Sequence, residues 1–275
     1  LQAIISDSDI RSLTVYRFII LLAACDIVGA SIHCVTGFAL IFPSFWSITL
    51  GNFLGSVLIP SYFCYILTEF LLSFVRFVQI LYPNCAEILF SPKRGKYWLS
   101  IVAAVYLPYF GIMISPLSMC SYNISSYTWE YDLSLPFSFF FMYIEQYVQQ
   151  SMIALSFILY IVIFAVLYRM GNVNGDSAHR ERRLMYQTFF ATAYATCLNF
   201  TSHNMGWINK GRLPVVYAAC TYFWLLNTAV YPLTFIVMNR TMRQKIISSL
   251  RFTRLTPKKL VTTTLKVMPS SRSLA

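Results

Sequence analysis

The amino-acid sequence predicts an all-α membrane protein, built as a bundle of helices that cross the bilayer. Three observations lead to this prediction. Hydrophobic residues make up 57% of the 275 residues and charged residues only 11%, well below the roughly one quarter typical of soluble proteins. The apolar residues form long continuous runs. Lysine and arginine collect in a few of the segments between those runs.

Six apolar runs are long enough to cross a hydrocarbon core of ~30 Å, which takes about 20 helical residues. Helices are expected because a lipid-exposed backbone must satisfy its own hydrogen bonds. Strands of a membrane barrel would instead alternate apolar and polar residues, which these runs do not. The expected spans are residues 18–42, 54–81, 97–119, 141–168, 184–208 and 213–238.

Basic residues predict which ends of the spans face the cytoplasm. Lys93, Arg94 and Lys96 lie between the second and third spans, and four arginines lie between the fourth and fifth. Nine basic residues and no acidic residue follow position 239. Because cytoplasmic segments carry the excess of Lys and Arg, these loops and the tail are expected inside the cell. The net charge of +11 therefore fits a membrane face, and no nucleic-acid partner is expected.

This orientation divides the chain into three parts. Residues 1–17 are interpreted as a cytoplasmic loop, residues 18–238 as a six-span transmembrane bundle, and residues 239–275 as a basic cytoplasmic tail. Apolar residues recur at helical spacing in the tail, which predicts an amphipathic helix on the inner leaflet. Asn123, in the sequence Asn-Ile-Ser, then falls on the outer face, where it is a candidate glycosylation site.

Ionisable residues inside spans are costly and usually mark function. Asp26 lies midway along the first span, and the second carries Glu69 and Arg76 seven residues apart. Asp26 is either a buried hydrogen-bonding group or a cation or proton site. Arg76 either extends toward the lipid headgroups or holds the cytoplasmic end of the bundle closed, with Glu181, next to Arg182, as a candidate partner.

The last span ends with a second candidate switch. Asn227 and Tyr231 are one helical turn apart, so they share a face. Pro232 follows and should kink the helix. This kinked end either repacks between two states or is a plain proline kink of the kind common in membrane helices.

The opposite halves of the spans hold the candidates for a ligand pocket. Glu145 and Gln149 form an i, i+4 pair, and Asn199 and His203 form another, with Tyr62 at a comparable depth. The space between the helices of a bundle is a usual place for a small-molecule site. The alternative is that these side chains hydrogen-bond helices to one another.

Motifs of enzymes and metal sites are missing from the sequence. The seven cysteines form no CxxC pair, and the chain has no HExxH, GxSxG, P-loop or GxGxxG motif. We therefore expect a protein that is not an enzyme and has no cofactor and no bound metal.

Four sequence segments, taken in order, resemble the pattern of G-protein-coupled receptors. They are LAACD, LSFVRF, an ERR run before a span, and NTAVYP followed by NRTMR. The finer resemblance is to nematode serpentine chemoreceptors of the SRT/SRX-like classes. It implies a seven-transmembrane bundle that binds a small molecule and activates a heterotrimeric G protein, at the plasma membrane and in a sensory cilium. It assigns coupling roles to Arg76, Glu181, Arg182, Asn227 and Tyr231.

The resemblance also raises an expectation about the start of the chain. Six spans put both ends of the chain inside, whereas such receptors begin outside, so we expect that helix 1 precedes Leu1. Receptors of this kind commonly pair a cysteine of the third helix with one of the following outer loop. Cys120 has no such partner at the outer start of the 54–81 span.

Two other functions are compatible with the residues. One is a ligand-gated channel of inverted topology, with its tail outside. The other is a transporter or accessory membrane protein without G-protein coupling.

Overall fold

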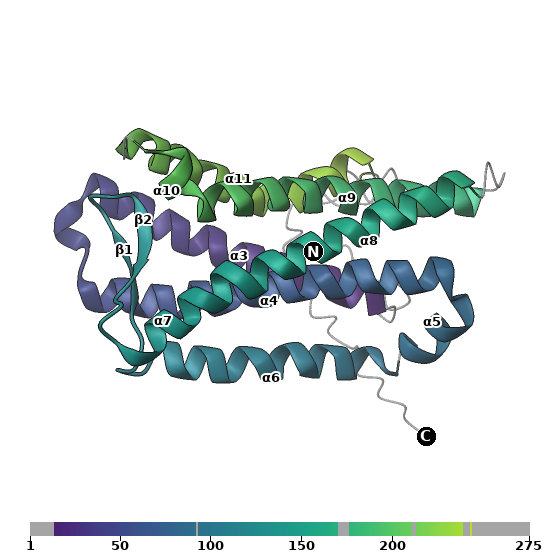
Figure 1. Ribbon diagram of the computed structural model, residues 1–275, viewed down its shortest axis with the longest axis horizontal. Helices are drawn as coiled ribbons and strands as arrows, with labels where there is room; N and C mark the ends of the chain where they lie inside the picture. The colour runs from purple at the N-terminus through teal and green to yellow at the C-terminus, as the bar shows by residue number, and fades with distance from the viewer. Residues whose placement is uncertain (1–13, 92, 170–175, 211–212, 239–242, 244–275) are drawn as a thin grey trace, which may run out of the picture.

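The computed structural model describes residues 14–91, 93–169, 176–210, 213–238 and 243. Its helices run roughly side by side along the long axis of an elongated bundle, and a small β-hairpin lies across one end (Figure 1). We call this the hairpin end, and the opposite end, where a short helix turns the chain, the α5 end.

The expected spans all correspond to helices, with shifted ends. The long helices are α3 (Thr14–Ile41), α4 (Ile48–Leu81), α6 (Gly95–Met113), α9 (Asp176–His203) and α11 (Pro214–Met238). A further long helix consists of α7 (Pro136–Tyr143) and α8 (Gln150–Arg169), joined by the π-helical turn η2 (Ile144–Gln149). Short helices are η1 (Pro43–Phe45), α5 (Pro83–Leu89) and α10 (Met205–Ile208).

Local chemistry explains where several helices begin and end. Helix α4 begins earlier than expected because the Ser47 side chain caps it, accepting a hydrogen bond from the Leu50 amide at 3.2 Å. Helix α7 begins at Pro136, since proline suits the first turn of a helix. Helix α6 ends at Met113 rather than at residue 119, because Pro116 disfavours helix at the residue before it.

Helix α4 is the centre of the bundle. It packs against α3, α6 and α8, while α9 packs against α8 and α11, and α11 packs back against α3. Helices α3, α4, α8, α9 and α11 therefore form a closed ring, with α6 outside it on α4. The main core joins α3 to α4 through the fully buried Phe18, Leu22, Leu72 and Val75.

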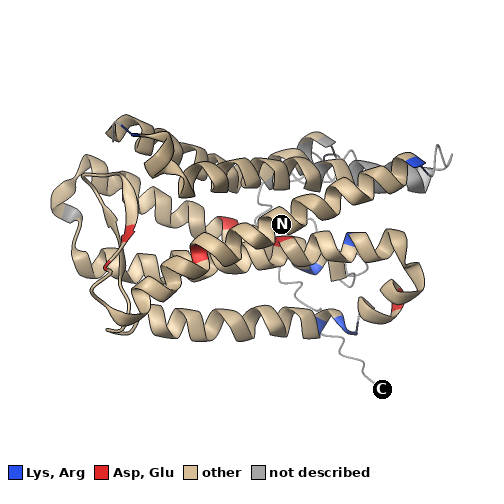
Figure 2. Ribbon diagram, viewed as in Figure 1, with Lys and Arg blue, Asp and Glu red and all other residues tan. Residues whose placement is uncertain are grey.

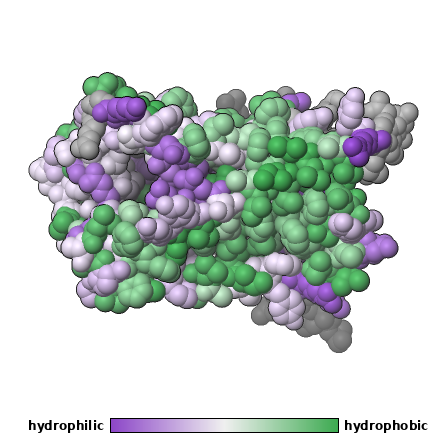
Figure 3. All heavy atoms as spheres, in the orientation of Figure 1, coloured by the Kyte–Doolittle hydropathy of each residue, from purple (hydrophilic) through white to green (hydrophobic). Residues whose placement is uncertain are grey.

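The outer faces of the helices are apolar. Among the residues that the structure describes, four helical segments are long and apolar enough to cross a membrane: α3, α4, α6 and the continuous helix from Pro136 to Arg169. The apolar part of α11 is shorter, at Pro214–Val230. Large apolar side chains such as Phe38, Leu107 and Ile158 are exposed on these surfaces, and Figure 3 shows a broad apolar surface over the bundle. Lipid, not water, suits such a surface.

The hairpin was not anticipated from the sequence. Strand β1 (Cys120–Asn123) pairs antiparallel with β2 (Thr128–Tyr131), with Cys120 opposite Tyr131 and Asn123 opposite Thr128. Both strands lie in the segment between α6 and α7. This hairpin supplies one wall of the cavity described next.

Candidate functional site

The hairpin is held tightly against the first turns of α4. A Cβ atom on Gly55 would overlap the backbone carbonyl oxygen of Cys120 and lie 2.9 Å from its carbonyl carbon. Only glycine leaves room for this approach of strand to helix. Nearby, the indole nitrogen of Trp46 donates to the Tyr122 carbonyl at 3.1 Å. These contacts fix β1 across the end of the bundle.

Hydrogen bonds around one carboxylate order the turn of the hairpin. Glu130 accepts from Asn123 Nδ2 at 2.9 Å, Ser126 Oγ at 2.5 Å and Thr128 Oγ1 at 3.0 Å. Partial burial alone would raise the pKa of Glu130, but these three hydrogen bonds together hold it below its ordinary value. Both carboxylate oxygens of Glu130 are therefore engaged within the hairpin.

The tip of the turn docks on helix α11. Tyr127 adopts a left-handed backbone conformation, with φ 59°, which is uncommon for a bulky residue. Its carbonyl oxygen accepts a hydrogen bond from Thr221 Oγ1 at 2.8 Å. The hairpin thus bridges from α4 to α11 and covers the space between them.

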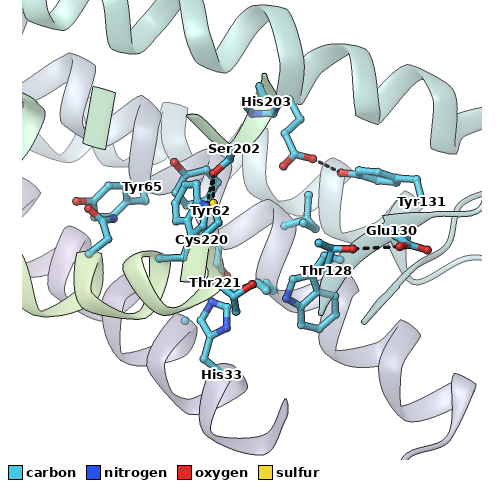
Figure 4. A pocket seen from close by; sticks show the side chains of 18 of the residues that line it. His33, Tyr62, Tyr65, Thr128, Glu130, Tyr131, Ser202, His203, Cys220 and Thr221 are labelled. Atoms are coloured by element: carbon cyan, nitrogen blue, oxygen red, sulfur yellow. Dashed lines mark hydrogen bonds between the residues drawn. The ribbon is translucent and has the colours of Figure 1, made fainter. Parts of the chain in front are cut away.

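Beneath the hairpin lies a cavity of about 610 Å³, a size usual for small-molecule sites. Its walls come from α3, α4, β2, the α7–η2 segment, α9 and α11. Figure 4 shows His33, Tyr62 and Tyr131 approaching it from different elements. The lining includes six large aromatic side chains: Tyr62, Tyr65, Trp129, Tyr131, Tyr217 and Trp224.

Three of the five expected pocket residues line this cavity: Tyr62, Glu145 and His203. Asn199 lies behind the wall, where its Nδ2 donates a hydrogen bond to the Tyr62 hydroxyl. Gln149 does not line the cavity and is fully buried. The i, i+4 spacing suggested that Gln149 shares a face with Glu145, but the wider π turn instead places Glu145 and Gln146 in the wall.

Glu145 is linked to the hairpin by one hydrogen bond. The Tyr131 hydroxyl donates to Glu145 Oε2 at 2.9 Å, a contact drawn as a dashed line in Figure 4. Burial, together with the nearby Glu145 carboxylate, raises the pKa of Tyr131 well above its ordinary value. The Tyr131 hydroxyl therefore keeps its proton and acts as the donor.

The expected switch residues divide between two places. Asp26 and Asn227 line the cavity, whereas Arg76 is buried at 6% exposure in α4 and donates to Gln79 Oε1 at 3.4 Å. This burial disagrees with the alternative in which Arg76 extends to the headgroups. Glu69 accepts a 2.7 Å hydrogen bond from Thr192 Oγ1 on α9.

The remaining coupling candidates belong to helices whose backbone is described, but their side chains are not. Glu181 and Arg182 lie in α9, and Tyr231 lies in α11, outside the described side chains. The expected pairing of Arg76 with Glu181 therefore stays a prediction. The amphipathic helix expected in the tail lies outside the described residues.

Several wall residues were missed by the sequence reasoning. Trp129 and Tyr131 reach the cavity only because β2 folds back over it, and Trp224 stacks edge-on against Tyr62 with ring centroids 4.7 Å apart. The Trp224 indole nitrogen donates to Ser202 Oγ at 2.6 Å. A usable signal was present, because the residues Thr-Trp-Glu-Tyr at 128–131 alternate polar and aromatic side chains, as half-buried strands do.

The cysteines and the ionisable groups form no other obvious centre. All seven cysteines, each within the described residues, are free, and Cys120 is fully buried under the hairpin. Over the residues described, no group of three or more His, Cys, Asp or Glu side chains is placed to hold a metal ion.

Comparison with known protein families supports an assignment. The family model described as serpentine type 7TM GPCR chemoreceptor Srt matches residues 1–259. No curated protein is similar enough to count as a match. The family is a class of receptors, and together with the long apolar helices it establishes a multi-pass membrane protein with a helical bundle of the G-protein-coupled receptor kind. The chain belongs to the Srt family of serpentine seven-transmembrane chemoreceptors.

Proposed function

We propose that the cavity under the hairpin binds a small-molecule stimulus, and that binding activates a heterotrimeric G protein at the α5 end. The observation that supports this most strongly is the cavity itself. It is walled by four of the five helical elements of the ring and covered by a hairpin that is fixed to two of them. A ligand there contacts several helices at once, and it can favour one arrangement of them over another.

Helix α9 is the element that best couples the cavity to the α5 end. Asn199 joins it to Tyr62 in the cavity wall, and Thr192, two turns further along, joins it to Glu69. A ligand that rotates Tyr62 competes directly with the first of these bonds. Since both bonds connect α9 to α4, a change at the cavity alters how the two helices pack further toward the α5 end.

The α5 end carries the groups proposed to meet the G protein. Apart from Lys210, which follows α10, the described Lys and Arg residues lie toward this end of the bundle (Figure 2). That distribution supports a cytoplasmic α5 end. We assign the coupling role to Arg76, with Glu181, Arg182 and Tyr231 as its proposed partners.

Nucleotide exchange on a co-expressed G protein tests this assignment. Basal and stimulated exchange are measured for the wild type, Arg76→Gln and the control Lys210→Gln, using a broad panel of small organic molecules as stimuli. Lys210 is an exposed basic residue near the hairpin end. We expect Arg76→Gln alone to lose exchange while ligand binding persists. Full exchange in Arg76→Gln would overturn the coupling assignment.

The orientation and localisation are tested separately. We propose a plasma-membrane receptor, in a sensory neuron concentrated in the cilium, with its tail inside and Asn123 glycosylated outside. Asn123 Nδ2 keeps one hydrogen after glycosylation, so the hydrogen bond to Glu130 is compatible with an attached sugar. A tag after Ala275 should be reached by antibody only in permeabilised cells. Labelling of intact cells would favour a channel of inverted topology.

A further inference from the structure

The described side chains of the cavity wall include acidic groups but no lysine or arginine to balance them. The described lining contains three carboxylates, those of Asp26, Glu130 and Glu145, and neither lysine nor arginine. The two histidines of the lining, His33 and His203, are its only other titratable groups besides tyrosine and cysteine. The field inside the cavity therefore favours a positive charge on whatever enters it.

The three carboxylates are not equally available to a ligand. Glu130 has both oxygens engaged by Asn123, Ser126 and Thr128. Glu145, in contrast, accepts at Oε2 from the Tyr131 hydroxyl, and no described basic side chain in the wall is there to neutralise it. A carboxylate in an apolar wall is costly without a cationic partner.

Two deeply buried acceptors also face the cavity without a donor. Asp26 is 7% exposed and its Oδ2 has no hydrogen-bond partner among the described residues. Asn227 is 4% exposed, and its Oδ1 likewise has no partner within the described part of the chain. Both residues line the cavity. Both acceptors are therefore open to a donor group on a ligand in the cavity.

Aromatic rings cover much of the remaining wall. Tyr62 and Trp224 pack edge to face, and Trp129 and Tyr131 descend from the hairpin. Faces of tyrosine and tryptophan attract cations, tryptophan most strongly, and their rings also bury an apolar body. Acidic and aromatic residues together are the chemistry that recognises an organic ammonium group.

We propose that the ligand is a protonated amine with an apolar or aromatic body, whose ammonium group pairs with Glu145 beside the Tyr131 hydroxyl. This proposal rests on the proposed receptor function and specifies its stimulus. A second donor group on the ligand reaches Asp26 or Asn227. An anionic ligand would meet carboxylates with no described basic side chain to offset them. A neutral ligand would leave the Glu145 carboxylate with the Tyr131 hydrogen bond but without a cationic partner.

Matched small molecules test the charge preference. The probes are 2-phenylethylamine, 2-phenylethanol and 3-phenylpropionate, with butylamine and butanol as a smaller pair. Binding is measured as thermal stabilisation of the full chain, purified in detergent and reconstituted in lipid discs. We expect stabilisation by the amines at concentrations at least about tenfold lower than for the alcohols, and none by the carboxylate.

Two substitutions test whether Glu145 is the source of the preference for amines. Glu145→Gln removes the charge and keeps the shape, and Glu87→Gln is the control, because Glu87 is an exposed carboxylate on α5 at the far end. We expect Glu145→Gln to erase the preference for amines, and Glu87→Gln to retain it. If Glu145→Gln does not fold, Tyr131→Phe replaces it, and a several-fold loss for amines is expected because the hydroxyl that orients the carboxylate is gone.

The outcomes separate this proposal from the receptor function. Three results would overturn the assignment of an amine. They are tighter binding of the alcohols or of the carboxylate, an unchanged preference for amines in Glu145→Gln, and no binding by any amine. G-protein activation by neutral molecules alone would leave the receptor function standing. Amine binding without any nucleotide exchange would instead support the ligand class and reject the coupling.

Discussion

Replacing Gly55 by alanine should loosen the hairpin from the bundle. The added Cβ would overlap the Cys120 carbonyl oxygen, and neither the α4 backbone nor the β1 backbone can rotate away as a side chain would. Overpacking of this kind costs about 1–3 kcal/mol. Alanine also gains about 1 kcal/mol of helix propensity over glycine. The change in stability must therefore be compared with that of a Gly→Ala substitution elsewhere in a helix.

Gly111 provides that control. It lies in α6, and an added Cβ there meets nothing within 4 Å. Gly111→Ala therefore gains the helix propensity without the overlap. The difference between the two variants isolates the overlap, and it corresponds to about 2–12 °C in melting temperature at ~2–4 °C per kcal/mol.

Chemical labelling of Cys120 measures how often the hairpin lifts from α4. This thiol is fully buried under the hairpin, so it reacts only when the strand lifts from α4. A shift of 1–3 kcal/mol raises the open population about 5- to 150-fold, and maleimide labelling mapped by mass spectrometry should rise accordingly. If Gly55→Ala and Gly111→Ala label Cys120 at the same rate and melt together, the close approach of strand and helix is wrong.

Three further predictions concern the polar contacts. Thr192→Val removes the donor to Glu69 Oε1 and should lower the free energy of unfolding by about 1–3 kcal/mol. Combined with Glu69→Gln, it should cost less than the sum of the two single substitutions, which a double-mutant cycle in denaturation would show. Tyr62→Phe and Asn199→Ala should each change ligand affinity, and a coupling energy of zero between them would contradict their hydrogen bond. The lowered pKa of Glu130 means that its hydrogen bonds stabilise the hairpin above its ordinary pKa of about 4.5, and that this contribution is lost as the pH falls through the lower folded value. The protection factors of the hairpin amides, which correct for the intrinsic pH dependence of amide exchange, should therefore fall in the wild type as the pH drops below 4.5, but change little with pH in Glu130→Gln.

The long helices were predictable because hydrophobic length is a property of the sequence alone. Each expected span overlaps a helix, and the errors lie at the ends, where the Ser47 cap and Pro116 act over a few residues. The hairpin was not predicted. Its strands are four residues each, and their apolar side chains belong to a segment that otherwise reads as an outer loop.

The candidate site was likewise predictable only in part. Glu145 and His203 were recognisable because polar side chains stand out in apolar runs, and both line the cavity. The alternation around Trp129 and Tyr131 could have indicated a strand, but their place in the wall was not recognisable, because it depends on the chain folding back over α4. The π turn at Ile144–Gln149 also could not be read from residue spacing, and it is what separates Gln149 from Glu145.

Helix α9 is held to α8 by an apolar cluster that includes Tyr160, Ile163 and Met185, and to α4 and α11 by polar contacts. The polar contacts bear on how a signal would cross the bundle. Helices α3 and α4 share a large, close-packed apolar core. Polar bonds connect α9 to α4 at Thr192 and Asn199, and to α11 at Ser202 and at Tyr194, whose hydroxyl donates to the Phe223 carbonyl at 2.7 Å. Hydrogen bonds exchange partners at little net cost, since each is worth only about 1 kcal/mol. A ligand that offers Tyr62 or Ser202 a new partner therefore acts on the contacts that join α9 to α4 and α11. We expect α9 to be the helix that is displaced on binding.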